Sequence, residues 1–202
     1  MKIADTAGIL LAGGRSSRFG SNKALALFRG RPLISHAARL LADLFAETLL
    51  VTNSPADYDF LNWPMSADIF PGAGPLAGIH AALTKVAAPR LFVVGCDMPL
   101  VQEPLVRLLC RADEEWDAVV PALKGGLEPL CALYHKRCLP AVEANLLSGN
   151  HKLHTLFDQI RSRKISEEEL RCHDPQLLSF LNINRHRDLE AVSRLDHFDA
   201  SL

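Results

Sequence analysis

Short, uniformly apolar runs alternate along this chain with stretches that carry apolar residues at helical spacing. The first run, residues 7–12, is followed by two glycines and predicts a strand buried on both faces. Residues 33–44 then place apolar side chains three or four positions apart, which predicts a helix that starts near Pro32. Repeated alternation of this kind is typical of an α/β protein with a mostly parallel sheet and helices on both faces.

The alternation continues toward the C-terminus. Further strands are expected at residues 49–52, 91–94, 118–121, 130–134 and 180–184, and further helices at 76–86, 103–111, 140–147 and 187–192. Residues 148–180 are less regular, and the three glutamates at 167–169 are typical of a solvated helix face. No repeat or linker interrupts the series, so we expect a single domain over residues 1–202.

Composition excludes several classes of protein. A chain of 202 residues with 49% hydrophobic and 22% charged residues is ordinary for a globular protein and can bury a sizeable core. Its apolar runs are far shorter than the roughly 20 residues that a membrane span needs, so no membrane partner is expected. With 22 basic and 23 acidic residues the net charge is −1, which argues against binding of nucleic acid by bulk electrostatics.

The cysteines and the N-terminus bear on the cellular compartment. The five cysteines are odd in number and show no C-x-x-C spacing, which argues against a disulfide framework or a zinc ribbon. The N-terminus has no cleavage pattern of a signal peptide. We therefore expect reduced thiols and a cytoplasmic protein.

The loop after the first predicted strand is rich in glycine and cations. Ligands of open α/β sheets bind beyond the carboxyl ends of the strands, so this is where chemistry is expected. The loop reads LAGGRSSRFG over residues 11–20, and no acidic residue occurs between Arg15 and Arg31. Glycines let backbone amides approach an anion, while Arg18 and Lys23 offer donors for phosphate oxygens. The spacing matches neither the P-loop nor G-x-G-x-x-G, and an ordinary turn with solvated cations is the alternative.

Two further loops carry carboxylates. Asp97 follows the apolar run 91–94, and one carboxylate beside a polyphosphate is a usual way to hold Mg²⁺. Taken alone, Asp97 fits a turn or cap residue better than a metal ligand, and Cys96 fits a small buried apolar residue better than a nucleophile. Asp68 precedes PGAGPLAG at residues 71–78, which by itself indicates only a rigid turn into a helix.

Together these motifs are more specific than any one of them. In chain order the sequence reads L-A-G-G-x-S-x-R-x-G-x-x-K, G-P-L-A-G-I, C-D-M-P, E-P-L-C-A-L-Y and N-I-N. The series resembles the molybdenum cofactor guanylyltransferase family, called MobA-like, over nearly the whole chain. Many nucleotidyltransferases share the first motif, whereas the combination is narrower. The resemblance implies a Rossmann-like fold of the nucleotide-diphospho-sugar transferase type.

The same resemblance implies a reaction and its partners. GMP would pass from GTP to molybdenum-bound molybdopterin, giving the guanine dinucleotide cofactor and pyrophosphate with the help of Mg²⁺. Molybdoenzyme chaperones or other cofactor-biosynthesis proteins are candidate protein partners, and a monomer is expected.

The resemblance also implies the site residues. Nucleotide contacts would come from Leu11, Ala12, Gly13, Gly14, Lys23, Asn53, Asp68 and Asp97, and pterin-side contacts from Asn182 and Asn184. Lys23, Asp97 and Arg18 would act in catalysis, and Asp97 would hold the metal. Phe19 and Arg185 depart from the methionine and threonine that are usual in the family.

Two other kinds of function stay open. One is a related nucleotidyltransferase, either cytidylyl-transferring or acting on cobinamide phosphate. Cytidylyl relatives tend to carry alanine at the position of Gly13, so the glycine favours a purine. The other is a non-catalytic nucleotide-binding protein. The presence of both Lys23 and Asp97 argues against this alternative. His151 and His154 are spaced for one helix face, but no third ligand is near in sequence, which favours solvated side chains over a metal site.

Overall fold

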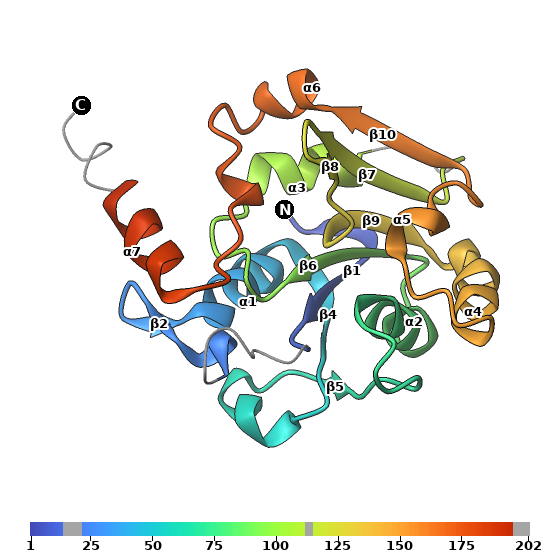
Figure 1. The fold of residues 1–202 in the computed structure, drawn as a ribbon, viewed down its shortest axis with the longest axis horizontal. Coiled ribbons are helices and arrows are strands. Elements are labelled where there is room, and N and C mark those ends of the chain that lie inside the picture. The colour runs from blue at the N-terminus through green and yellow to red at the C-terminus, as the bar shows by residue number, and fades with distance from the viewer. Residues whose placement is uncertain (14–21, 112–114, 196–202) are drawn as a thin grey trace.

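The computed structural model describes residues 1–13, 22–111 and 115–195 (Figure 1). The strands are β1 (Ile3–Leu11), β2 (Leu27–Phe28), β3 (Arg31–Pro32), β4 (Phe45–Val51), β5 (Met65–Ser66), β6 (Arg90–Gly95), β7 (Ala118–Leu123), β8 (Gly126–Leu127), β9 (Cys131–His135) and β10 (Ser162–Ser166). The α-helices are α1 (Leu33–Leu44), α2 (Pro75–Lys85), α3 (Glu103–Cys110), α4 (Leu139–Leu147), α5 (Leu153–Leu156), α6 (Glu167–Arg171) and α7 (His186–Leu195).

Eight strands of the described chain form one sheet in the order β10-β7-β9-β6-β1-β4-β5, with β8 paired to β7. β1, β4, β5 and β6 run parallel, and β10 runs parallel to β7. β9 is antiparallel to both of its neighbours, and β2 and β3 form a separate hairpin. The prediction of a mostly parallel α/β sheet is therefore confirmed.

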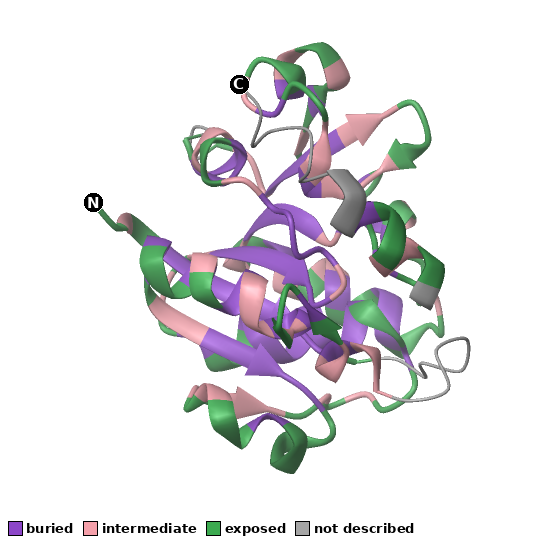
Figure 2. Ribbon diagram, turned by 90° about the vertical axis from the view of Figure 1, so that its left-hand side faces the viewer, coloured by how far each residue is buried: buried purple, intermediate pink, exposed green. Residues whose placement is uncertain are grey.

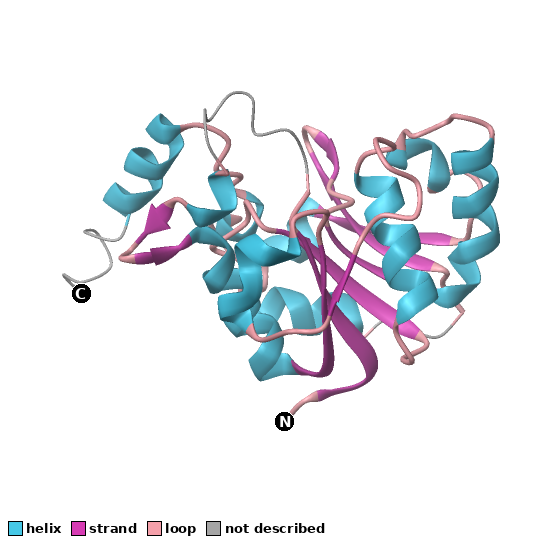
Figure 3. Ribbon diagram, turned by 90° about the horizontal axis from the view of Figure 1, so that it is seen from below, coloured by secondary structure: helices cyan, strands magenta, loops and turns pink. Residues whose placement is uncertain are grey.

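Helices cover both faces of the sheet (Figure 3). Leu10 of β1 belongs to the apolar layer that includes α1 and α3, whereas Ile9 and Leu11 belong to the layer that includes α2, α4 and α5. Because alternate residues of a strand face opposite sides, a strand covered on both faces must be apolar throughout. The central strands are accordingly buried along most of their length (Figure 2).

The predicted strand at residues 180–184 is wrong. Residues Leu178–Phe180 form a 3₁₀ turn, and the chain that follows is irregular up to α7. Ile183 is fully buried in a third apolar cluster with Phe28 and Val192, and its amide donates to the Asp97 carbonyl oxygen at 2.9 Å. The apolar residue that suggested a strand instead anchors this crossing segment.

The region 148–180 contains regular elements that its sequence pattern did not predict. β10 is a polar strand at the edge of the sheet, and Ile165 is its one buried residue. A single apolar position gives no detectable period of two, which is why the strand was missed. The acidic run does begin a helix, α6, whose first turn is capped by the Ser166 hydroxyl. No helix in the described ranges is both long enough and apolar enough to cross a bilayer.

Strand register brings the functional loops together. Leu11 at the end of β1 lies opposite Val51 of β4 on one side and Gly95 of β6 on the other. The three parallel strands therefore end at the same edge of the sheet. Residues just beyond these ends face one shared region.

Candidate functional site

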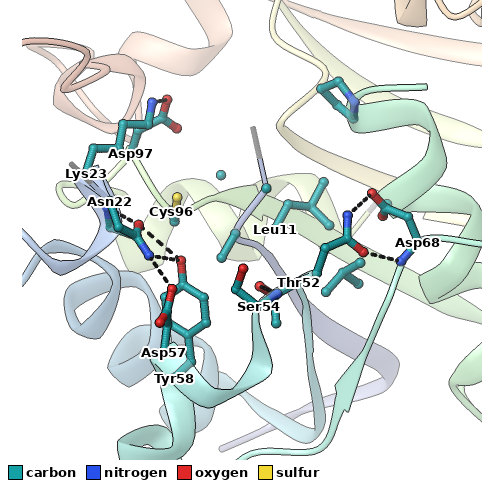
Figure 4. Close-up of a pocket in the computed structure, with 18 of the residues that line it drawn as sticks. Leu11, Asn22, Lys23, Thr52, Ser54, Asp57, Tyr58, Asp68, Cys96 and Asp97 are labelled. Carbon is teal, nitrogen blue, oxygen red and sulfur yellow. Dashed lines mark hydrogen bonds and ion pairs between the residues drawn. The ribbon is translucent and has the colours of Figure 1, made fainter. Parts of the chain in front are cut away.

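A cleft of about 1360 Å³ opens at this edge of the sheet (Figure 4). It lies where open α/β sheets bind ligands. The predicted site residues that line it are Leu11, Ala12, Gly13, Lys23, Asn53, Asp68 and Asp97. Gly14 and Arg18 lie outside the described residues. Lys23 and Asp97 lie at one end of the cleft and Asp68 at the other (Figure 4).

Asp97 and Lys23 form an ion pair at the first end. The Lys23 Nζ donates to Asp97 Oδ2 at 2.6 Å, and each side chain is 19% exposed. Asp97 is placed by β6, which ends two residues earlier, and Lys23 by a 3₁₀ turn over Lys23–Leu25 that the Asn22 side chain caps. A partly desolvated cation and carboxylate suit the binding of a polyanion together with a divalent metal.

The pair also contacts the C-terminal segment. Lys23 Nζ donates to Asn184 Oδ1 at 3.0 Å, beside the bond from the Ile183 amide to Asp97. The two predicted halves of the site, one for the nucleotide and one for the acceptor, therefore meet at Lys23.

The absence of a side chain at Gly95 leaves space for the Asp97 carboxylate. A Cβ added at Gly95 would lie 2.6 Å from Asp97 Oδ1, whereas one added at Gly125 has no heavy atom within 4 Å. We expect Gly95→Ala to displace the carboxylate and lower kcat/KM on the order of tenfold to 100-fold, because small misplacements of a site are costly. The flexible carboxylate can move aside, so the melting temperature should change little.

Steady-state rates and thermal melts of both alanine variants test this expectation. Gly125→Ala should match the parent in both measurements. If Gly95→Ala retains full activity, the observed position of the carboxylate is not required.

Asn53 and Asp68 form a reciprocal pair at the other end. Asn53 Nδ2 donates to Asp68 Oδ2 at 2.9 Å, and the Asp68 amide donates to Asn53 Oδ1 at 3.0 Å. Asn53 follows β4 and Asp68 follows β5, which pairs with β4, so adjacent strands bring the two residues together. Both were predicted for the nucleotide side, and the structure joins them into one unit.

A second polar cluster on the cleft wall was not predicted. Asn22 Nδ2 donates to Asp57 Oδ2 at 3.1 Å and to the Tyr58 hydroxyl at 3.0 Å. Burial raises the pKa of Tyr58, so its phenol stays neutral. The cluster holds Asn22 beside Lys23 and so fixes the turn that carries the lysine. Asparagine is a common N-cap residue, so Asn22, directly before Lys23, was the one sequence feature that could have predicted the capped turn.

Glu128 also lies near Asp97. It precedes β9, and its Oε1 accepts a hydrogen bond from the Leu130 amide at 3.4 Å. Burial raises the pKa of Glu128, and the nearby Asp97 charge raises it further. Glu128 belongs to the E-P-L-C-A-L-Y motif, and nothing in the local sequence predicts that it lies near Asp97.

Cys96 is buried beneath the cleft. Burial raises the pKa of its thiol to about 12, and the Asp97 charge contributes in the same direction. The thiol is therefore neutral near pH 7, which fits the interpretation of Cys96 as a small apolar residue.

No group of three or more histidine, cysteine or acid side chains in the described ranges could hold a metal ion by itself. His151 and His154, both exposed, belong to no such group. Asp97 instead offers one carboxylate at the cleft. Such a donor fits Mg²⁺, which commonly binds through one or two carboxylates together with substrate phosphates.

The mostly parallel sheet and the cleft at the carboxyl ends of its central strands are those of the nucleotidyltransferase fold. The crystal structure of 2-C-methyl-D-erythritol 4-phosphate cytidylyltransferase from Thermus thermophilus superposes with a TM-score of 0.69 at 16% identity, covering 98% of this chain and 100% of that one. That likeness concerns the fold alone. Residues 8–165 match the MobA-like NTP transferase domain, and the chain belongs to this family.

Other relatives extend the match to more than nine-tenths of the chain. Molybdenum cofactor guanylyltransferase of Desulfosudis oleivorans is 38% identical over 91% of this chain and 92% of its own. A probable molybdenum cofactor guanylyltransferase of Carboxydothermus hydrogenoformans is 37% identical over 92% and 94%. Molybdopterin-guanine dinucleotide biosynthesis protein A of Archaeoglobus fulgidus superposes with a TM-score of 0.82 at 26% identity, covering 95% and 99%.

Proposed function

We propose that this protein transfers GMP from GTP to molybdenum-bound molybdopterin, forming the guanine dinucleotide cofactor and pyrophosphate. The observation that carries the proposal is the similarity to a molybdenum cofactor guanylyltransferase across nine-tenths of both chains. The cleft supports it, because a cation and a carboxylate meet there beside the segment that carries Asn184.

The reaction needs no nucleophile from the protein. An oxygen of the acceptor's terminal phosphate attacks the α-phosphorus of GTP. A new P–O bond forms as the bond to the α–β bridging oxygen breaks, and pyrophosphate leaves with that oxygen. Because the attacking phosphate is already an anion, the protein must mainly hold two polyanions in line. Positioning of this kind supplies on the order of 7–11 kcal/mol.

Lys23 and Asp97 have distinct tasks in this proposal. Lys23 would neutralise triphosphate charge as it builds up in the transition state. Asp97 would hold Mg²⁺ together with the nucleotide phosphates. The ion would supply Lewis-acid stabilisation of the developing charge. Because the two side chains are paired before the nucleotide binds, the lysine must exchange part of that pairing for phosphate oxygens.

The setting proposed for the enzyme is the cytoplasm, where thiols stay reduced. All five cysteines are free, and four of them are buried, which supports this setting.

Gly13 offers a test of base preference. It is exposed on the cleft, its backbone lies outside the left-handed region, and an added Cβ meets nothing within 4 Å. Gly13→Ala is therefore expected to keep its melting temperature and to place a methyl group in the cleft where the base is expected. We expect the ratio of GTP to CTP transfer rates to fall. An unchanged ratio in a stable variant would mean that Gly13 does not read the base.

The decisive experiment incubates the protein with molybdenum-loaded molybdopterin and each Mg-NTP in turn, and scores dinucleotide product and pyrophosphate. We expect product with GTP and much less with CTP. Preference for CTP would assign the cytidylyl reaction instead. Nucleotide binding without turnover on either pterin or cobinamide phosphate would favour the non-catalytic alternative.

A further inference from the structure

The side chain of Asn22 caps the turn that carries Lys23. Its Oδ1 accepts from the Ala24 amide at 3.2 Å, and its backbone oxygen accepts from the Leu25 amide at 3.1 Å. Ala24 is itself buried in the apolar layer that includes α1 and α3. The turn is therefore held at the residue directly before the lysine whose ammonium contacts Asp97.

Two contacts with opposite chemistry fix the orientation of the Asn22 side-chain amide (Figure 4). The Ala24 backbone amide can only donate, so the Asn22 carbonyl oxygen must face it. An ionised carboxylate can only accept, so the Asn22 NH₂ group must face Asp57 Oδ2, at 3.1 Å. The Tyr58 hydroxyl oxygen lies 3.0 Å from that nitrogen and 3.2 Å from the carbonyl oxygen, so it can accept from one and donate to the other. A reversed amide would oppose two donors at one contact and two acceptors at the other.

The wall that faces Asn22 is anchored in the apolar core. Tyr58 is 3% exposed and belongs to the same apolar cluster as Ala24. Tyr58 and Asp57 lie in the 3₁₀ segment Pro55–Leu61, which connects β4 to β5. Burial raises the pKa of Tyr58, so its hydroxyl keeps the proton that bonds to Asn22. The position of this wall is therefore set by the core and not by the turn that it contacts.

We propose that Asp57 and Tyr58 are positioning residues for nucleotide binding: they hold the Asn22 amide in the one orientation that caps the turn, and so direct the Lys23 ammonium to the triphosphate. The inference rests on the proposed function in giving Lys23 a phosphate partner. Asp57 and Tyr58 act through Asn22 and do not touch the phosphates themselves. They follow Asn53 on the same connection, so a segment that contributes to one end of the cleft also sets the cation at the other end.

Asp57→Asn separates positioning from simple electrostatics by the sign of its effect. Loss of an acidic charge beside a site for a polyanion would, by charge alone, strengthen GTP binding. The proposal predicts the opposite, because either end of the new amide can face Asn22 and no longer enforces its orientation. We expect the Kd for GTP to rise about three- to tenfold, as for loss of a hydrogen bond, and the Kd for guanosine to stay at the parent value. Asp59→Asn, a change of an exposed carboxylate in the same segment, is the matched control and should not weaken GTP binding.

Exchange of the two side chains provides a rescue that a merely structural role would not show. Asn22→Asp alone opposes two carboxylates where the Asn22 Nδ2 now lies 3.1 Å from Asp57 Oδ2. The turn should shift, and GTP should bind about tenfold more weakly. Adding Asp57→Asn returns one carboxylate and one amide to the pair, and the carboxylate at position 22 can still accept from the Ala24 amide, so the double variant should bind GTP within about twofold of the parent. Failure of this rescue would overturn the proposal, as would unchanged or tighter GTP binding in Asp57→Asn.

A double-mutant cycle tests whether the effect passes through the lysine. Tyr58→Phe removes the hydroxyl, keeps the buried ring in place and should weaken GTP binding about three- to fivefold. Its melting temperature should fall by no more than about 4 °C. If Tyr58 acts through Lys23, then Tyr58→Phe added to Lys23→Ala should weaken GTP binding no further. Additive effects would overturn the proposal.

One measurement needs no substrate. The side-chain amide resonances of Asn22, assigned by their loss in Asn22→Ala, should shift in Asp57→Asn and in Tyr58→Phe but not in Asp59→Asn. Resonances that ignore both changes would overturn the proposal. Calorimetric titration with GTP needs no acceptor, so it separates the proposal from the proposed function. If the variants weaken GTP binding as expected but the parent transfers nothing to a pterin, the proposed function fails and the roles of Asp57 and Tyr58 stand.

Discussion

Asp97→Asn is expected to leave a folded protein that has lost Mg²⁺-dependent transfer, with kcat/KM falling on the order of 100-fold or more. A neutral amide is a poor ligand for a hard cation, so the metal would lose its protein carboxylate. The fold should survive, because the asparagine oxygen can still accept from Lys23. The bond from Ile183 uses the backbone carbonyl oxygen and is unaffected.

Initial rates over a range of Mg²⁺ concentrations, together with thermal melts, check this result. The exposed Asp158 provides the matched control, since Asp158→Asn removes one carboxylate elsewhere on the surface. Activity near that of the parent in Asp97→Asn would remove Asp97 from the metal site.

Lys23→Ala should weaken GTP binding roughly 10- to 100-fold, the range expected for loss of a hydrogen bond to a charged group. Binding of free guanosine should change little, because the lost interaction is with the triphosphate. The variant also frees Asn184 from its bond to the lysine, so the acceptor KM should rise as well.

Calorimetric titrations with GTP and with guanosine separate the contribution of the triphosphate to binding from that of the nucleoside. Lys85→Ala, a change of an exposed lysine at the end of α2, is the control for removal of one positive charge. Equal weakening of GTP and guanosine would mean that Lys23 acts on the shape of the cleft and not on the phosphates.

The central strands were predictable because burial on both faces leaves a run of apolar residues, as in residues 7–11 of β1 and 91–94 of β6. The predicted strand ends also located the loops that follow them, and these loops contain Gly13 and Asp97. β10 was missed since an edge strand with one buried residue carries no such pattern. The antiparallel direction of β9 could not be predicted from the sequence either, because apolar runs look alike in parallel and antiparallel strands.

The site residues divide in a similar way. Lys23, Asp68 and Asp97 are charged residues within three positions of a glycine or proline, so the sequence alone could nominate them. Their partners could not be predicted from spacing, since the Asn22–Tyr58 and Lys23–Asn184 contacts depend on how distant loops fold over the sheet edge. Gly14 and Arg18 lie outside the described residues, and their assigned roles stay predictions.

Two members of the third apolar cluster, Ile183 and Val192, and the motif that precedes α7 lie beyond residue 165, where the match to the family domain ends. This segment joins the cleft through few points, chiefly Ile183 to Asp97 and Asn184 to Lys23. Natural selection could therefore exchange the segment while the triphosphate half stays intact. Homologues that use the same nucleotide on different acceptors should diverge mostly after β10, and chimeras crossed over at that strand should inherit the acceptor choice of their C-terminal parent.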